Sequence, residues 1–145
     1  MGALGGHMAH LHESLELTFD ELSTILDSVA NADVAATEKV DGQNLFLTVK
    51  NDGSINTARN GGDLKKGGMT PEEFAAKWNG HPAEGAFTKG FEAISRAIES
   101  LDQGTLNDLF ANGTRYVNME VMYPGNPNMI VYDAGNVVVH NFQTF

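Results

Sequence analysis

The stretch KVDGQNLFLTVKNDGSINTARNGG, residues 39–62, combines strand-like runs with tight-turn residues. Three strand-like runs lie in it or beside it: Val34–Val40, Asn44–Lys50 and Ile55–Arg59. Asp41-Gly42 joins the first two runs, and Asn51-Asp52-Gly53-Ser54 joins the second to the third. Both junctions contain Asp-Gly, a dipeptide typical of hairpin turns because glycine readily adopts a positive φ. We therefore predict a β-meander, with a lysine, a tight turn and an arginine where adjacent strands meet.

Helices and further strands are expected in the rest of the chain. The capping-box pattern Thr18-x-x-Glu21 predicts a helix to about Ala30, and Thr70-Pro71-Glu72-Glu73 predicts the start of another after a loop over Asn60–Met69. The remaining predicted elements are a helix over Glu84–Leu101, a short turn around Leu106–Phe110, and strands over Tyr116–Tyr123, Met129–Tyr132 and Val137–Phe142. The expected class is α+β, with helices packed on a predominantly antiparallel sheet.

The composition narrows the chemistry. The chain has 145 residues, 41% of them apolar, which suits one domain with one core. It has no cysteine, and its five histidines are too scattered for a zinc ligand pattern, so a metal would have oxygen ligands, as magnesium prefers. The formal charge of −10 argues against a broad phosphate-binding surface. A local basic patch is still expected around the hairpin, from Lys39, Lys50, Arg59, Lys65 and Lys66.

The ends of the chain and its hydropathy suggest a compartment. Residues 1–8, MGALGGHM, read as an expression leader, so the domain is expected over residues 9–145. No apolar run approaches the roughly 20 residues of a membrane span, and no secretion signal is visible. We expect a cytoplasmic protein with no membrane partner.

The segment Lys39-Val40-Asp41-Gly42 carries the chemistry that stands out. A neutral lysine amine is a nucleophile, Gly42 leaves room beside it, and Asp41 can fix the turn or orient the amine. The alternative is that Asp41-Gly42 is only a hairpin turn and that Lys39 is a solvated edge residue.

Lys39-x-Asp41-Gly42 resembles motif I of the covalent nucleotidyltransferases, the family of ATP- and NAD-dependent DNA ligases, RNA ligases and mRNA capping enzymes. In that family the lysine takes AMP or GMP onto its amine. Arg59-Asn60-Gly61 resembles the segment, one hairpin later, that contacts ribose and phosphates; the alternative is a lone surface arginine. The resemblance implies ATP as the donor, Mg²⁺ or Mn²⁺ as the metal, and nucleotide contacts from Lys39, Gly42, Arg59, Asn60 and Gly61.

Two later segments extend the resemblance. Glu120 lies in an otherwise apolar strand, where a carboxylate costs stability unless it is paired or ligating. It is similar to the motif III glutamate, which implies a catalytic role and a contact with ribose or metal, and Pro124–Tyr132 looks like the same region of phage RNA-repair ligases. Val137–Phe142 is similar to motif IIIa, whose aromatic or apolar side chain packs on the purine, and Phe142 and Phe46 are the candidates for that stacking. The alternatives are a solvent-facing glutamate and a core phenylalanine.

The resemblance implies a nucleotidyltransferase-like domain of the RNA-ligase type that forms a lysyl-AMP for joining RNA or DNA 5′-phosphate ends. Because no counterparts of motifs IV and V precede Phe145, residues 9–145 are expected to be a single, partial domain. The alternative is a non-catalytic nucleotide-binding or protein-interaction module. We also expect that the exposed sheet edge at the last strand supports a homodimer, and that a phage-encoded protein works in the host cytoplasm.

Overall fold

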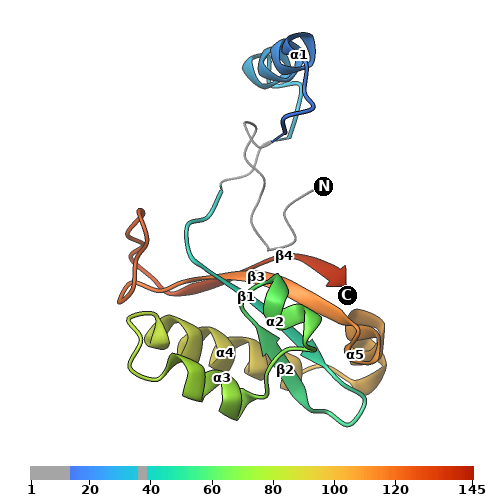
Figure 1. Ribbon diagram of the computed structural model, residues 1–145, viewed down its shortest axis with the longest axis vertical. Coiled ribbons are helices and arrows are strands. Elements are labelled where there is room, and N and C mark those ends of the chain that lie inside the picture. Colours follow the sequence, from blue (N-terminus) through green and yellow to red (C-terminus); the bar gives the residue numbers. More distant parts are fainter. Residues whose placement is uncertain (1–13, 36–38) are drawn as a thin grey trace. The chain divides into compact units, whose positions relative to one another are not determined.

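The structure, a computed structural model, describes residues 14–35 and 39–145. The described residues up to Lys39 belong to one compact unit, and Val40–Phe145 form a second (Figure 1). The expected leader over residues 1–8 lies outside the described part of the chain. Across the described ranges, no helix has the length and apolar character needed to cross a membrane.

The first unit contains helix α1 (Phe19–Ala30). Its start is fixed by a capping box: Thr18 accepts a hydrogen bond from the backbone N–H of Glu21, and the Glu21 carboxylate accepts one from the backbone N–H of Thr18. The helix predicted from this pattern is confirmed. None of its side chains is buried, and Phe19 is 91% exposed.

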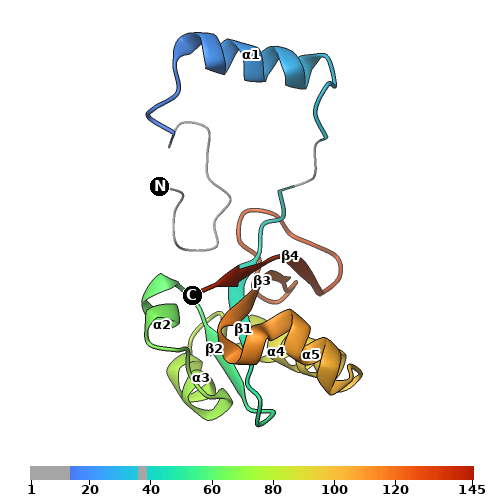
Figure 2. The same cartoon turned by 90° about the vertical axis from the view of Figure 1, so that its right-hand side faces the viewer.

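The second unit is built on a four-stranded sheet. Its strands are β1 (Gln43–Val49), β2 (Ile55–Ala58), β3 (Arg115–Met122) and β4 (Asn136–Thr144). They lie in the order β2-β1-β3-β4, and each neighbouring pair is antiparallel (Figures 1 and 2). Gly53, with a φ of 79°, closes the β1–β2 hairpin at the predicted turn. The α+β class with a predominantly antiparallel sheet is therefore confirmed.

Helices connect β2 to β3: α2 (Gly61–Lys65), α3 (Pro71–Trp78), α4 (Glu84–Glu99) and α5 (Gln103–Phe110), with a 3₁₀ turn at Ala111–Gly113. Thr70 and Glu73 form the predicted capping box at the start of α3. Asp102 caps α5, because its carboxylate accepts from the N–H of Thr105. These local signals set where the chain turns from loop to helix.

The two faces of the sheet are covered by different helices. On one face, strand side chains pack against α3, α4 and α5; the core there includes Leu45, Leu47, Val117, Met119, Val121, Phe74, Phe87 and Phe110. On the other face, Phe46 packs with Leu64 of α2 and with Tyr116. Gly90 lets α4 lie close to β3, because a Cβ there would overlap the Val121 side chain. Since successive side chains alternate, Glu120 belongs to the face away from α4.

Three predicted segments differ from the structure. The described residues of Val34–Val40 are not in a strand; both edges of β1 are already paired, with β2 and with β3, so β1 has no free edge for them. Met129–Tyr132 is loop, because its backbone groups bond to the Asp41 side chain instead of a strand. The predicted loop Asn60–Met69 contains the short helix α2.

Candidate functional site

The candidate site is built around Asp41 and Gly42, which lead directly into β1 beside the end of β3. The predicted hairpin turn at these two residues is wrong: the chain only bends at Gly42, and no strand precedes it among the described residues. The backbone N–H of Gly42 donates a hydrogen bond of 2.7 Å to Oε1 of Glu120. A Cβ at position 42 would lie 2.5 Å from the carbonyl oxygen of Val121, so only glycine fits this close approach. The structure therefore brings Gly42 and Glu120 into direct contact.

His140 of β4 is the second partner of Glu120. Its Nε2 lies 3.0 Å from Oε2 of Glu120, and both side chains are about one-fifth exposed, at 20% and 19%. The two residues share a face because Glu120 pairs with Val138 in the β3–β4 register, and a bulge follows between Asn118 and Met119. Each carboxylate oxygen keeps a lone pair for a further donor. Only the strand register reveals this contact of His140.

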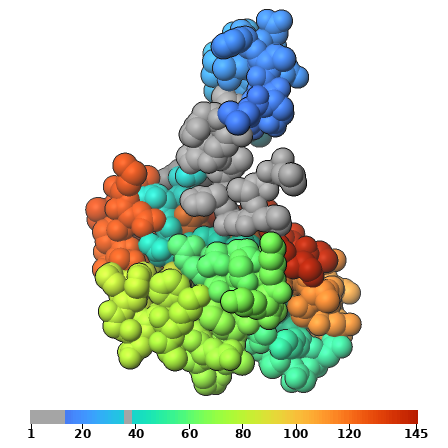
Figure 3. Space-filling view, in the orientation of Figure 1, coloured from blue at the N-terminus to red at the C-terminus, as the bar shows by residue number. Residues whose placement is uncertain are grey.

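The loop between β3 and β4 closes over Asp41. Oδ2 of Asp41 accepts hydrogen bonds of 2.7 Å from the backbone N–H groups of both Met129 and Ile130. In return, the N–H of Asp41 donates to the hydroxyl of Tyr132 at 3.0 Å. In the space-filling view, this loop (orange) lies against the segment that leads into β1 (cyan; Figure 3). Asp41 thus orders the loop.

Asn128 adds a second tie between the same loop and the turn. Its side-chain amide donates to the carbonyl of Gly42 at 2.7 Å, and its side-chain oxygen accepts from Nε2 of Gln43 at 2.8 Å. Together with the Asp41 bonds, these contacts hold residues 41–43, at the start of β1, against a loop that lies more than 80 residues later in the chain. The sequence resemblance gave no reason to single out Gln43 or Asn128.

Arg59 lies beside this assembly without touching Glu120. Its Nη2 donates to Oε1 of Gln43 at 3.3 Å, and its guanidinium carbon stands 5.6 Å from the centre of the Phe87 ring of α4. Burial lowers the pKa of the Arg59 guanidinium, and the carboxylates of Glu120 and Asp63 oppose that shift. Arginine nevertheless stays charged in proteins, so Arg59 supplies a partly buried cation next to the turn.

The other predicted nucleotide contacts serve local roles in this structure. The side chain of Asn60 caps α2 by accepting from the N–H groups of Gly62 and Asp63, and Gly61 is the first residue of that helix. Phe142 packs edge-on against Phe110 of α5, with ring centres 5.8 Å apart. Phe142 pairs with Val117, whose side chain belongs to the core that packs against α3, α4 and α5. Phe142 therefore lies on the opposite face of the sheet from Glu120.

Lys39 is exposed and immediately precedes the second unit. Gly42 is three positions further along the chain, so their Cα atoms are at most about 11 Å apart whatever path the chain takes.

The described residues contain no group of three or more histidine and acidic side chains arranged to hold a metal ion. Glu120 and His140 form a pair only. Magnesium commonly binds through one or two carboxylates together with substrate phosphates. The pair is therefore compatible with a metal that arrives with a nucleotide, and not with a site closed by protein ligands alone.

Comparison with known proteins gave no match: no family model fits the chain, and neither the curated proteins nor the solved structures include one that matches it.

Proposed function

We propose that this chain is a nucleotidyltransferase-like domain of the RNA-ligase type, in which Lys39 accepts AMP from ATP. The observation that carries the proposal is the 2.7 Å hydrogen bond between the Gly42 N–H and Glu120. It joins the two segments that resemble motifs I and III. Lys39 lies three positions before Gly42, so their Cα atoms are at most about 11 Å apart.

The proposed reaction is adenylyl transfer to an amine. The neutral Nζ of Lys39 attacks the α-phosphorus of ATP, a P–N bond forms, the bond to the bridging oxygen breaks, and pyrophosphate leaves. The amine gives up a proton in the same process. Mg²⁺ or Mn²⁺ would neutralise charge on the phosphates. Asp41 and Gly42 would set the path of the chain beside the lysine, and the free lone pairs of Glu120 would accept a ribose hydroxyl or hold the metal.

Arg59 contributes a cation at the same end of the sheet. Its guanidinium is held by Gln43, so a phosphate or ribose oxygen would meet a donor whose position is already fixed. The lysyl-AMP would then pass its AMP to a 5′-phosphate end of RNA or DNA. With a chain charge of −10, contacts to that polynucleotide must be local or come from other parts of the assembly.

Labelled ATP tests the proposal. Incubation with Mg²⁺ and ATP labelled in its α-phosphate should transfer label to the protein, whereas ATP labelled in its γ-phosphate should not. Lys39→Ala should abolish the transfer, and Lys65→Ala, at an exposed position in α2, should leave it unchanged. Label from the γ-phosphate, or transfer that survives Lys39→Ala, would refute the assignment.

A second candidate is a non-catalytic nucleotide-binding or protein-interaction module. It is favoured by the internal hydrogen bonds of both carboxylates: Asp41 is occupied by the loop, and Glu120 by Gly42 and His140. The acidic charge also favours a protein partner over nucleic acid. Equilibrium binding of ATP that is equally tight in wild type and Lys39→Ala, with no label transferred in either, would support this module.

A further inference from the structure

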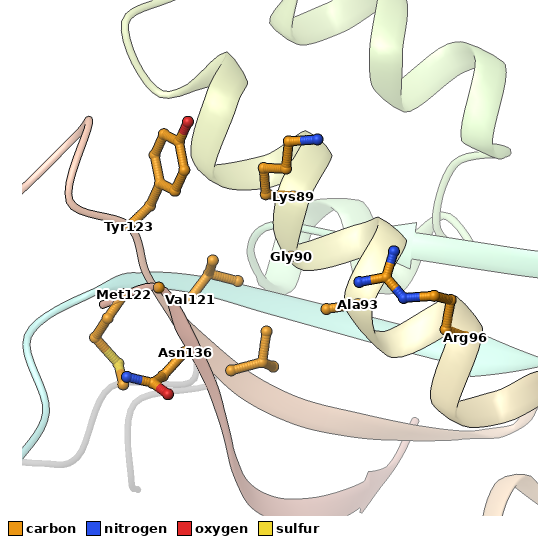
Figure 4. A pocket seen from close by; sticks show the side chains of 10 residues that line it. Lys89, Gly90, Ala93, Arg96, Val121, Met122, Tyr123 and Asn136 are labelled. Atoms are coloured by element: carbon orange, nitrogen blue, oxygen red, sulfur yellow. The ribbon is translucent and has the colours of Figure 1, made fainter. Parts of the chain in front are cut away.

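A hollow of about 270 Å³ lies between α4 and the adjoining ends of β3 and β4 (Figure 4). Its lining includes Val121 and Val137 from the strands and Ala93 from α4. Val121 belongs to the helix-covered core, so the hollow is on the opposite face of the sheet from Glu120. It is therefore separate from the candidate adenylylation site.

Two cations stand at this hollow. Lys89 and Arg96 both line it, and a separation of seven residues, about two helical turns, puts them on one side of α4. Figure 4 shows both side chains extending from α4 above the apolar side chains of the strands. Tyr123 adds an aromatic ring and a hydroxyl at the other end of the lining. The lining thus combines an apolar floor with positive charge.

The two cations differ in how they are engaged. Lys89 makes a salt bridge of 2.9 Å with Glu92, which offsets its charge. Within the described part of the chain, Arg96 has no acidic partner within 4.0 Å. Its guanidinium therefore keeps its fork of donors, which matches the oxygens of a carboxylate or a phosphate. The chain has 19 acidic and 9 basic residues, so an arginine with no acidic partner beside a hollow stands out from its surroundings as a site for an anion.

We propose that this hollow binds a small organic anion: a carboxylate or phosphate monoester with a compact apolar body. Arg96 binds the charged group, and the apolar body lies over Val121, Val137 and Ala93. The volume is below the roughly 300–1,000 Å³ of sites for drug-sized ligands, so the ligand has a single ring or a short chain.

The hollow also adjoins both ends of the loop that closes over Asp41. Tyr123, before the loop, and Gly135, at its end, both line it. A bound anion would contact both ends of the loop. Because Gly90 and Gly135 line the hollow, the chemical shifts of their backbone amides would change on binding.

The test is an NMR titration of backbone amide shifts in the full chain with benzoate, phenyl phosphate and, as a neutral isostere, benzamide. At least one anion should shift the Gly90 and Gly135 amides saturably, and the comparison between the two anions distinguishes carboxylate from phosphate recognition. Benzamide should bind about tenfold more weakly or not at all, because it lacks the charge that strengthens hydrogen bonds to arginine.

Variants make the assignment specific to the hollow. Arg96→Gln, at an exposed position that should not disturb folding, is expected to weaken anion binding about tenfold. The control Lys65→Gln removes one positive charge from α2 and should leave the affinity unchanged. The proposal is overturned if neither anion gives saturable shifts at these amides, if benzamide binds as well as the anions, or if Arg96→Gln binds as tightly as wild type.

Discussion

Gly42 donates its backbone N–H to Oε1 of Glu120 at 2.7 Å, although 78 residues separate the two. The bond joins the residue that directly precedes β1 to Glu120 near the end of β3, and it fixes the position of a carboxylate beside Gly42. His140 holds the other oxygen of the same carboxylate.

Replacing Glu120 should destabilise the fold. Glu120→Ala leaves the Gly42 N–H and the His140 ring without their partner in a partly buried setting, which should lower the free energy of unfolding by about 1–3 kcal/mol. Glu120→Gln keeps an oxygen for Gly42 and should cost less. Urea unfolding of the three proteins measures the difference; equal midpoints for wild type and Glu120→Ala would show that these bonds contribute nothing.

Removing the Asp41 carboxylate should loosen the loop between β3 and β4. In Asp41→Ala the N–H groups of Met129 and Ile130 lose their acceptor, so their hydrogen exchange should accelerate. Asp41→Asn retains an acceptor oxygen and should have a smaller effect. Exchange of amides in β1 serves as the internal control, since a global loss of stability would accelerate those as well. Unchanged exchange at Met129 and Ile130 in Asp41→Ala contradicts the role of Asp41.

The outer edge of β4 should support self-association. β4 spans nine residues, carries no lysine, arginine, aspartate or glutamate, and pairs only with β3 among the described strands. An open, uncharged edge is a template for strand pairing. The mass in solution should rise toward that of a dimer with concentration, and Val139→Lys should suppress the rise. Thr88→Lys adds the same charge on the exposed side of α4 and should not. A wild-type protein that stays monomeric at every concentration contradicts this prediction.

Tyr116 should make the fold sensitive to alkaline pH. Burial raises the pKa of its hydroxyl above the ordinary value of 10.0. The folded chain therefore holds the phenolic proton more tightly than the unfolded chain, and the associated stability is complete below pH 10 and is lost as pH rises through the raised pKa. Tyr116→Phe should show a smaller loss of unfolding free energy above about pH 10 in urea titrations. Parallel curves for the two proteins would contradict the prediction.

The sequence predicted the elements with strong local signals. The capping boxes at Thr18 and Thr70 gave correct helix starts, and the turn at Gly53 gave the β1–β2 hairpin. Apolar composition alone misled at Met129–Tyr132, where the competing acceptor is a side chain almost 90 residues away. The helix α2 depends on a single cap by Asn60 in a glycine-rich segment. It has only five residues, which is too short for a helical hydrophobic period to be recognised in the sequence.

For the site, the sequence picked out Gly42 and Glu120, which a hydrogen bond joins, and Asp41, which instead bonds to the loop between β3 and β4. It could not identify His140, because that contact depends on the β3–β4 register and the bulge within it. Phe142 illustrates the same limit: alternation along β4 turns it toward α5, which only the register reveals. The residue types indicate which chemistry is possible, whereas the pairing of the strands determines which side chains come into contact.

The central claim is that Lys39 forms a covalent bond to AMP, and intact-mass spectrometry tests it most directly. After incubation with ATP and Mg²⁺, the wild-type chain should gain the mass of one AMP, and Lys39→Ala should gain nothing. Lys65→Ala should behave as wild type. A wild-type chain of unchanged mass under conditions where the protein is folded would contradict the account, and an equal gain in Lys39→Ala would place the nucleotide on another residue.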